Sequence, residues 1–355
     1  MSSHHILLSE SDRAKPDISD IIEPISIKIP NELSGMRLDV ALATIIPELS
    51  RNRLTNWIKK GHVLVNNQKL NPKDKIFGNE DVVVIPIISD EALAFTPENI
   101  PLEVIYVDEH ILIINKPAGL TVHPGNNNWS GTLLNALLYH YPELHSIPRA
   151  GIVHRLDKDT TGLMVVARTL SAQTNLVRQL QKRSIERIYR ALVIGTVPKA
   201  GTIEKNIGRD AHNRTKMTTL ELGGRVAITH YRVLYYLNNF SYIECKLETG
   251  RTHQIRVHLK SIGHPLVGDP VYGSKKINCA PNIINTIKNL DRQALHALKL
   301  SFIHPQNNQI MSFKIPLAND IKLVLAQLNL ELDQNNVDPL DNLEDKHEWE
   351  IIYAK

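Results

Sequence analysis

The segment Gly151–Ala167, GIVHRLDKDTTGLMVVA, decides how this chain is interpreted, because two apolar runs enclose a loop crowded with ionisable side chains. Gly151 to His154 and Leu163 to Ala167 are aliphatic and β-branched, and they predict two strands. Loops positioned by a rigid scaffold often carry functional side chains. Asp157 in this loop is therefore the first candidate, although an aspartate that caps a turn would have the same spacing.

A second segment, Leu247 to His258, reads LETGRTHQIRVH. Its glycine and Arg251 precede an apolar pattern with helical spacing, which predicts a helix capped by Thr252 and ending at Ile262. Arg251 is the candidate here, and an ordinary surface arginine is the alternative. The spacing of the residues alone indicates a basic α+β protein and does not indicate its function.

Composition excludes several classes of protein. The 355 residues suggest two to three domains, and a hydrophobic content of 42% supports a sizeable core. No apolar run approaches the roughly 20 residues of a membrane-spanning helix. The two cysteines, Cys245 and Cys279, exclude a disulfide framework and fit a cytoplasmic protein.

The net charge of +4 is unevenly distributed. Eight acidic residues and two lysines give residues 326–355 a net charge of −6, so residues 1–325 carry +10. A basic body with an acidic tail suggests a polyanionic partner, with which the tail would compete.

The pattern along the chain predicts five regions. They are a polar leader (1–24), a small domain (25–88), a linker (89–100), a large domain (101–325) and the acidic tail (326–355). In the small domain we expect helices at 37–46 and 51–60, the second capped by Ser50, and strands at 62–65 and 81–85. The exposed face of the second helix would carry Arg51, Arg53, Lys59 and Lys60.

The large domain is expected to be rich in strands, at 104–107, 111–115, 190–195, 227–234 and 242–247, with helices at 132–140 and 169–182. Strands outnumber helices and do not alternate with them regularly, which favours an α+β sheet over a doubly wound one.

Motifs for nucleotides and metals are missing from the sequence. Neither G-x-x-x-x-G-K-[ST] nor G-x-G-x-x-G occurs. The run that begins at Asp157 resembles a calcium loop, but its twelfth position is Arg168 instead of a glutamate. None of the sixteen histidines lies in H-E-x-x-H. We therefore predict no metal and no cofactor.

The amino-acid sequences of these segments resemble those of the RluA/RluD family of pseudouridine synthases, and those of the RluD type most closely. Its hallmarks match HRLDKDTTGL from His154, GRTHQIRVH from Gly250, and the K-P-x-G-L-x-V-H-P run from Lys116. Further matches are Tyr189 before an A-L-V-x-G strand and HPLVGDPVYG from His264. The small domain resembles an S4 RNA-binding module through Arg37-Leu38-Asp39, Ser50-Arg51 and the hairpin that starts at Gly61.

The resemblance implies a catalytic domain built on a mixed, mostly antiparallel sheet, and isomerisation of uridine to pseudouridine in RNA. The N1–C1′ bond breaks, the uracil rotates, and C5 bonds to C1′, so no cofactor is implied. Asp157 takes the role of the carboxylate near C1′, whether as a nucleophile or as a base. Arg251 matches the family arginine that pairs with this aspartate.

The resemblance assigns further roles around Asp157. The target uridine must be flipped out of folded RNA, and Arg155 matches the residue proposed to fill the gap, with a phosphate contact as the alternative. Tyr189 matches the tyrosine that stacks on the flipped uracil, although a core tyrosine would have the same local pattern. His154 is expected to support the loop, and both His154 and Lys116 are placed among the residues that contact RNA.

The predicted partner is 23S rRNA or a pre-50S particle, with helix 69 as the target and a monomeric protein. A same-class alternative is a synthase for another rRNA or tRNA uridine, and an alternative of another class is a non-catalytic assembly factor. Basic residues that could contact phosphates are Arg178, Lys182, Arg183, Arg187, Arg209, Arg214 and Lys216.

Overall fold

The computed structural model describes residues 24–47, 49, 51–85, 95–125, 129–274 and 278–328. The chain divides into two compact units, Met1–Asp90 and Glu91–Lys355. Nearly all of the predicted leader, the cap at Ser50, most of the predicted linker and the acidic tail beyond Leu328 lie outside the described residues. Among the described residues, no helix has the length and apolarity needed to cross a membrane.

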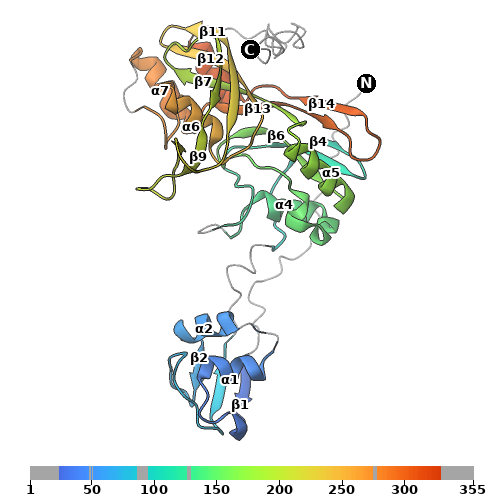
Figure 1. Cartoon of the computed structure of the whole chain (residues 1–355), viewed down its shortest axis with the longest axis vertical. Coiled ribbons are helices and arrows are strands. Elements are labelled where there is room, and N and C mark those ends of the chain that lie inside the picture. Colours follow the sequence, from blue (N-terminus) through green and yellow to red (C-terminus); the bar gives the residue numbers. More distant parts are fainter. Residues whose placement is uncertain are drawn as a thin grey trace, which may run out of the picture. The chain divides into compact units, whose positions relative to one another are not determined.

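The small unit packs two helices on a three-stranded antiparallel sheet of order β1-β3-β2 (Figure 1). Its core contains Leu38, Leu42, Leu54 and Trp57, so both helices bury one face as their periodicity predicted. Asn66 and Asn67 both have positive φ and form the tight turn after β2, a conformation that asparagine adopts more readily than most residues. The elements are β1 (Ile25–Lys28), η1 (Asn31–Leu33), α1 (Leu38–Ile45), α2 (Arg51–Lys59), β2 (Val63–Val65) and β3 (Asp81–Val84).

The large unit is organised around one mixed sheet, with the strand order β4-β5-β6-β13-β7-β12-β11-β8 and β14 paired to β13. Among the strand pairs of the described residues, only β6 and β13 run parallel, so the predicted mixed, mostly antiparallel α+β class is confirmed. The strands of this sheet are β4 (Glu103–Val107), β5 (Ile111–Lys116), β6 (Thr161–Ala167), β7 (Glu186–Ile194), β8 (Ala200–Glu204), β11 (Ile228–Leu237), β12 (Phe240–Leu247), β13 (Leu295–Ile303) and β14 (Ile310–Lys314).

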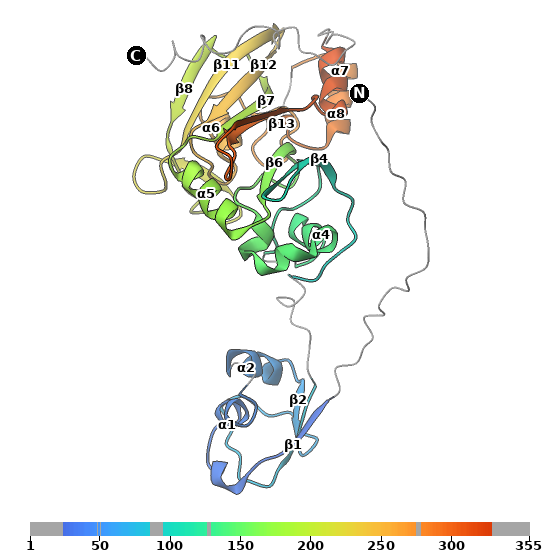
Figure 2. The same cartoon turned by 90° about the vertical axis from the view of Figure 1, so that its right-hand side faces the viewer.

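Helices cover both faces of this sheet, as Figure 2 shows for α4 and α5 near β4 and β6. Met164 and Val166 of β6 pack in the cluster that contains α4, whereas Leu163 and Val165 pack in the cluster that contains α5. Alternate residues of one buried strand thus serve two cores. The helices are α4 (Leu133–His140), α5 (Leu170–Gln181), α6 (Gln254–Ser261), α7 (Pro281–Leu290) and α8 (Asn319–Gln327).

Several segments differ from the sequence predictions. The predicted strand from Gly151 to His154 is wrong, because the 3-10 turn η3 (Pro148–Gly151) ends there and only Ile152 forms a bridge, to Val166. Helix α6 begins at Gln254 after a left-handed His253, not after Thr252. Strands β1, β8, β13 and β14, the separate hairpin of β9 (Asn206–Arg209) and β10 (Met217–Leu220), and helices α7 and α8 were not predicted.

Candidate active site

Buried contacts hold the loop that carries Asp157 in place. Leu156 anchors it in the core with 3% of its surface exposed. The Thr160 amide donates to the Asp157 carbonyl at 3.1 Å, and Gln293 Nε2 donates to the Thr160 hydroxyl at 3.0 Å. Asp157 itself remains 15% exposed at its side chain, so its carboxylate faces a pocket from a rigid backbone.

Lys116 is part of this support and is not an RNA contact. It is 1% exposed, and its Nζ donates to the carbonyls of Pro117, Leu120 and Lys158 at 2.7, 2.9 and 2.8 Å. Burial lowers the pKa of Lys116 to about 7, against the opposing influence of Asp159 and Asp157. The prediction that Lys116 contacts RNA is therefore wrong, because its ammonium group ties the end of β5 to the Asp157 loop.

Arg256, on α6, is the ion-pair partner of Asp157. Its Nη1 lies 3.0 Å from Asp157 Oδ2, while Nε and Nη2 bind both oxygens of Asp269 at 2.8 and 3.0 Å. The side chain of Asp269 is fully buried and that of Arg256 is 6% exposed. Burial alone would raise the pKa of Asp269, but Arg256 holds it below its usual value. Asp269 thus orients the guanidinium that faces Asp157.

The predicted pairing of Arg251 with Asp157 is wrong. Arg251 lines the same pocket, but its Nε donates to the Val226 carbonyl at 3.1 Å. The physical reason is the start of α6, because four residues lie between the two arginines and only Arg256 lies on the helix. The helical spacing of this segment predicts the helix that carries Arg256, but it gives no signal for the partner of Arg256.

The turn before α6 is fixed by Gln254. Its Oε1 accepts from the Thr249 hydroxyl and the Arg251 amide, at 2.8 and 2.9 Å, and its Nε2 donates to the Ile228 carbonyl at 3.0 Å. His253 adopts φ +56° and its Nδ1 lies 2.8 Å from the Tyr272 hydroxyl. These contacts hold the motif from Gly250 in one conformation and place Arg256 opposite Asp157.

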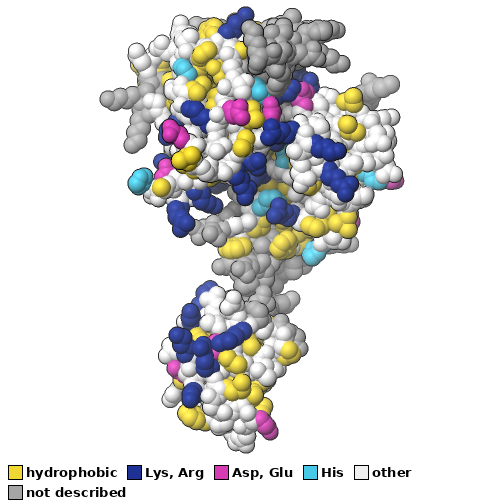
Figure 3. Space-filling model, in the orientation of Figure 1, with side chains coloured by type: hydrophobic (Ala, Val, Ile, Leu, Met, Phe, Trp, Pro, Cys, Tyr) yellow, Lys and Arg dark blue, Asp and Glu magenta, His cyan; other side chains and the backbone are white. Residues whose placement is uncertain are grey.

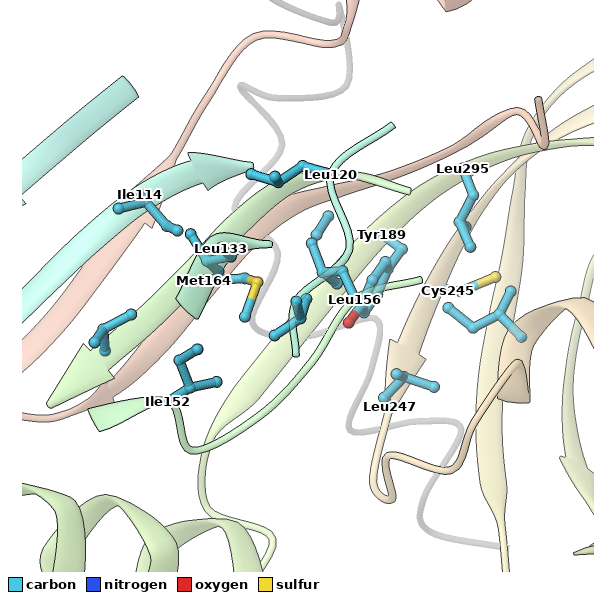
Figure 4. Packing of buried hydrophobic residues seen from close by; sticks show 14 of the residues in the cluster. Ile114, Leu120, Leu133, Ile152, Leu156, Met164, Tyr189, Cys245, Leu247 and Leu295 are labelled. Atoms are coloured by element: carbon cyan, nitrogen blue, oxygen red, sulfur yellow. The ribbon is translucent and has the colours of Figure 1, made fainter. Parts of the chain in front are cut away.

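Tyr189 of β7 lines the same pocket and is 5% exposed. Figure 4 shows its ring beside Leu156, with Cys245 and Leu247 nearby. Burial raises the pKa of Tyr189 to about 12, so its phenol stays neutral at physiological pH. The structure therefore brings Asp157, Tyr189 and Arg251 into one pocket, as predicted, and adds Arg256.

The two residues before Leu156 face different surroundings. Arg155 is exposed and lines the Asp157 pocket. His154 Nε2 accepts the Val165 amide at 3.0 Å, and burial lowers the pKa of His154 to about 3. A neutral imidazole that accepts a backbone hydrogen bond supports the loop, which is the role expected from the sequence.

The other predicted basic residues fall into two groups. Arg187 is 7% exposed and therefore lies below the open surface, so a phosphate could reach it only through a pocket. Arg183 pairs with Glu248 at 2.8 Å. The other cations of the large unit that were predicted to contact phosphates lie at its surface: Arg178, Lys182, Arg209, Arg214 and, partly covered, Lys216. Figure 3 shows Lys and Arg side chains gathered on the face of the large unit that it presents.

In the small unit, a buried carboxylate holds two arginines. Asp39, 2% exposed, accepts two hydrogen bonds from Arg37, at 3.0 and 2.9 Å, and two from Arg51, at 3.1 and 2.9 Å. The sequence pattern around Arg37 and Asp39 gives no indication of this ion-pair cluster. Lys59 and Lys60 are exposed as predicted, and the side chain of Arg53 lies outside the described residues. We call Arg37, Asp39 and Arg51 the Asp39 clamp.

Asp157, Arg256 and Tyr189 line one pocket, in which a partly exposed carboxylate lies beside a buried guanidinium. Such a carboxylate can act as an acid, a base or a nucleophile. The sequence of the large unit matches the family of RNA pseudouridylate synthases over residues 110–261, and that of the small unit matches the S4 domain over residues 36–82. The chain belongs to the RNA pseudouridine synthase family.

Named relatives agree with this assignment. The chain is 52% identical to ribosomal large subunit pseudouridine synthase D of Neisseria meningitidis serogroup B, over 92% of this chain and 86% of the relative. It is 48% identical to the protein of the same name from Nitrosomonas europaea, over 91% and 95%. The corresponding figures for the Escherichia coli protein are 46%, 85% and 93%.

A solved structure shares the fold of the large unit. Human RNA pseudouridylate synthase domain containing 4 superposes with a TM-score of 0.53 at 24% identity, covering 65% of this chain and 94% of that one. At this identity the likeness concerns the fold alone.

Proposed function

We propose that this protein isomerises uridine to pseudouridine in the 23S RNA of the large ribosomal subunit. The observation that carries the proposal is the partly exposed Asp157 carboxylate, ion-paired to Arg256 and facing Tyr189 in one pocket. The membership of the family, the matching S4 domain and the names of the relatives support ribosomal RNA as the substrate.

In the proposed reaction, Asp157 acts at C1′ of the ribose or at a neighbouring proton while the N1–C1′ bond breaks. The detached uracil rotates in the pocket and its C5 bonds to C1′. The hydrogen on C5 then leaves to water and N1 takes up a proton, so the product is an isomer of the substrate. Arg256 offsets the desolvation of the carboxylate, and the neutral Tyr189 ring offers a stacking face for the uracil.

Arg155 is proposed to occupy the space left by the flipped uridine, because its exposed guanidinium lies two residues from Asp157 on a fixed loop. The exposed cations of both units are proposed to contact phosphates, which makes binding salt-dependent. Residues 25–88 then serve as the RNA-binding domain and residues 101–325 as the catalytic domain. We propose helix 69 in a pre-50S particle as the target, a monomer as the active form and the cytoplasm as its location.

The test is tritium release from 23S rRNA transcript that carries C5-tritiated uridine. Wild type is expected to release tritium to water, and Asp157→Asn, which keeps the shape of the side chain but removes its charge, is expected to release none. Sequencing the product RNA then locates the pseudouridines and separates helix 69 from other targets.

Two outcomes would contradict the proposal. Equal release by wild type and Asp157→Asn would remove Asp157 from the chemistry. No release from transcript or from pre-50S particles that the protein binds would favour the non-catalytic assembly factor, especially if Asp157→Asn restored growth of a deletion strain.

A further inference from the structure

A second cavity, of about 680 Å³, adjoins the Asp157 pocket. This volume lies within the range of roughly 300–1,000 Å³ that is common for ligand sites. Its walls combine rings and cations: Trp129, His123, His154, Arg149, Arg155 and Arg187. Burial, together with Arg155 and Arg149, lowers the pKa of His123 to about 4, so its ring is neutral at physiological pH. Flat neutral rings beside guanidinium groups suit a nucleotide base.

Arg187 lies where the two cavities meet. Arg155, Arg187 and Gly250 line both of them. Arg187 is more than nine-tenths buried, and its Nη2 donates to the carbonyls of Leu247 and Glu248 at 3.4 and 3.1 Å. Its buried Nε has no hydrogen-bond partner among the described residues. A Cβ at position 250 would lie 2.8 Å from Arg187 Nη1, so glycine leaves room for the guanidinium at this junction.

A strained turn borders the same cavity. Arg149, Ala150 and Gly151 all adopt positive φ, at 56°, 49° and 75°. For residues other than glycine this conformation costs on the order of 1 kcal/mol or more each, and such strain gathers at functional sites. At Gly151 a Cβ would meet the Ala167 carbonyl at 1.8 Å. The turn is therefore firmly set, and it brings both Arg149 and Ile152 to the cavity wall.

We propose that this cavity binds the base of the nucleotide adjacent to the target uridine, and that Arg187 contacts the phosphodiester between the two nucleotides. The inference rests on the proposed function and names a second subsite for it. Adjacent nucleotides share one phosphate, just as the two cavities share one buried arginine. Trp129 and His123 supply stacking faces that accept any base, so this subsite would select an unstacked RNA strand and not a sequence.

The test uses an RNA hairpin with one target uridine and an abasic ribose in place of its 5′ or its 3′ neighbour. Binding is measured with Asp157→Asn, so the answer does not depend on isomerisation. With Trp129 present, one of the two abasic RNAs is expected to bind about 5- to 150-fold more weakly than the intact hairpin. In Asp157→Asn/Trp129→Ala this penalty should largely disappear. Tyr139→Ala, which truncates an exposed ring outside both cavities, should keep it.

Arg187 is tested with a methylphosphonate at the linkage on the sensitive side. The neutral linkage should weaken binding to the parent protein and have little effect on Arg187→Gln, with Arg187→Lys in between. Equal binding of intact and abasic RNAs on both sides would overturn the inference. Tritium release by wild type on the intact hairpin, measured separately, shows whether the proposed function itself has failed.

Discussion

Arg256 links a buried carboxylate to a partly exposed one, and this makes it the most consequential single side chain of the site. Arg256→Met would leave Asp269 buried without its cation. We expect the free energy of unfolding to fall by about 3–5 kcal/mol, the usual cost of breaking a buried pair on one side. Urea unfolding at neutral pH measures this loss.

Arg251→Met is the matched control for this prediction. Its guanidinium is partly exposed and donates to one carbonyl, so the expected loss is below about 1 kcal/mol. Arg256→Met/Asp269→Asn should recover part of the stability because it removes the unpaired charge. Similar losses for Arg251→Met and Arg256→Met would contradict the assignment of Arg256 as the cation that stabilises the buried Asp269.

Lys116 makes stability depend on pH in a predictable direction. Its pKa is about 7 in the folded protein against 10.5 for an ordinary lysine. Between these two values the unfolded chain binds a proton that the folded chain does not, so this group raises stability as pH increases from about 7. Relative to Lys116→Met, wild type should gain up to about 1.4 kcal/mol per pH unit over this window. Urea unfolding at pH 7, 8 and 9 measures the difference, and a constant difference would refute the prediction.

At the scale of elements, local patterns predicted those strands and helices whose periodicity is strong. The continuous apolar run of β5 and the apolar stripe of α5 are visible in the sequence, and both elements lie within two residues of the predicted ranges. Strand β13 was missed, although it occupies the middle of the sheet. It begins only four residues after Asp291, the left-handed cap of α7, and no turn signal separates its pattern from the helix.

Contacts between distant elements were beyond sequence reasoning. The segment from Gly151 to His154 has strand-like composition, but η3 and the positive φ of Gly151 prevent a second ladder beside β6. The motif contains both Arg251 and Arg256, the sequence singled out Arg251, and only the orientation of α6 towards the Asp157 loop shows that Arg256 is the residue that meets Asp157. Composition finds the residues of such a site, whereas the packing of helix and sheet determines which of them meet.

The parallel junction of β6 and β13 depends on Gly162. This residue has φ +121° and pairs with Ala297, and a Cβ would lie 2.3 Å from the Ala297 carbonyl oxygen. Gly162→Ala should therefore push the strands apart and lower the free energy of unfolding by about 3 kcal/mol or more. Gly119→Ala is the control, since φ is +81° there but nothing lies within 4 Å of the added carbon. It should cost only about 1–2 kcal/mol, and equal losses in urea unfolding would argue against a steric role for Gly162.

For the whole molecule, the two units lie on one chain, so RNA bound by one is held at high local concentration near the other. Modest contacts in the small unit can then raise affinity for RNA that the large unit modifies. Figure 3 shows Lys and Arg side chains gathered on the small unit as well as on the large one. Within the Asp39 clamp, the buried Asp39 carboxylate orients Arg37 and Arg51. These two arginines belong to the surface that we propose contacts phosphates.

The Asp39 clamp predicts that removing a negative charge weakens RNA binding, which is the opposite of what net charge predicts. Asp39→Asn raises the net charge from +4 to +5, and charge alone predicts tighter binding of RNA. If Asp39 orients Arg37 and Arg51 for phosphates, the same change should weaken binding. It should also make the slope of log affinity against log salt shallower by roughly 1.4–1.8, the contribution of two phosphate contacts. Titration of an rRNA fragment between about 50 and 200 mM salt measures both quantities.

Asp81→Asn is the matched control, because Asp81 is an exposed acid of the same unit and its change adds the same charge. It should bind RNA at least as tightly as wild type. Thermal unfolding of both variants establishes that the small unit remains folded. The double variant Arg37→Gln/Arg51→Gln, which keeps Asp39, should show the same shallower salt slope. If Asp39→Asn binds as tightly as Asp81→Asn, the clamp orders the fold of the small unit and not its contacts with RNA.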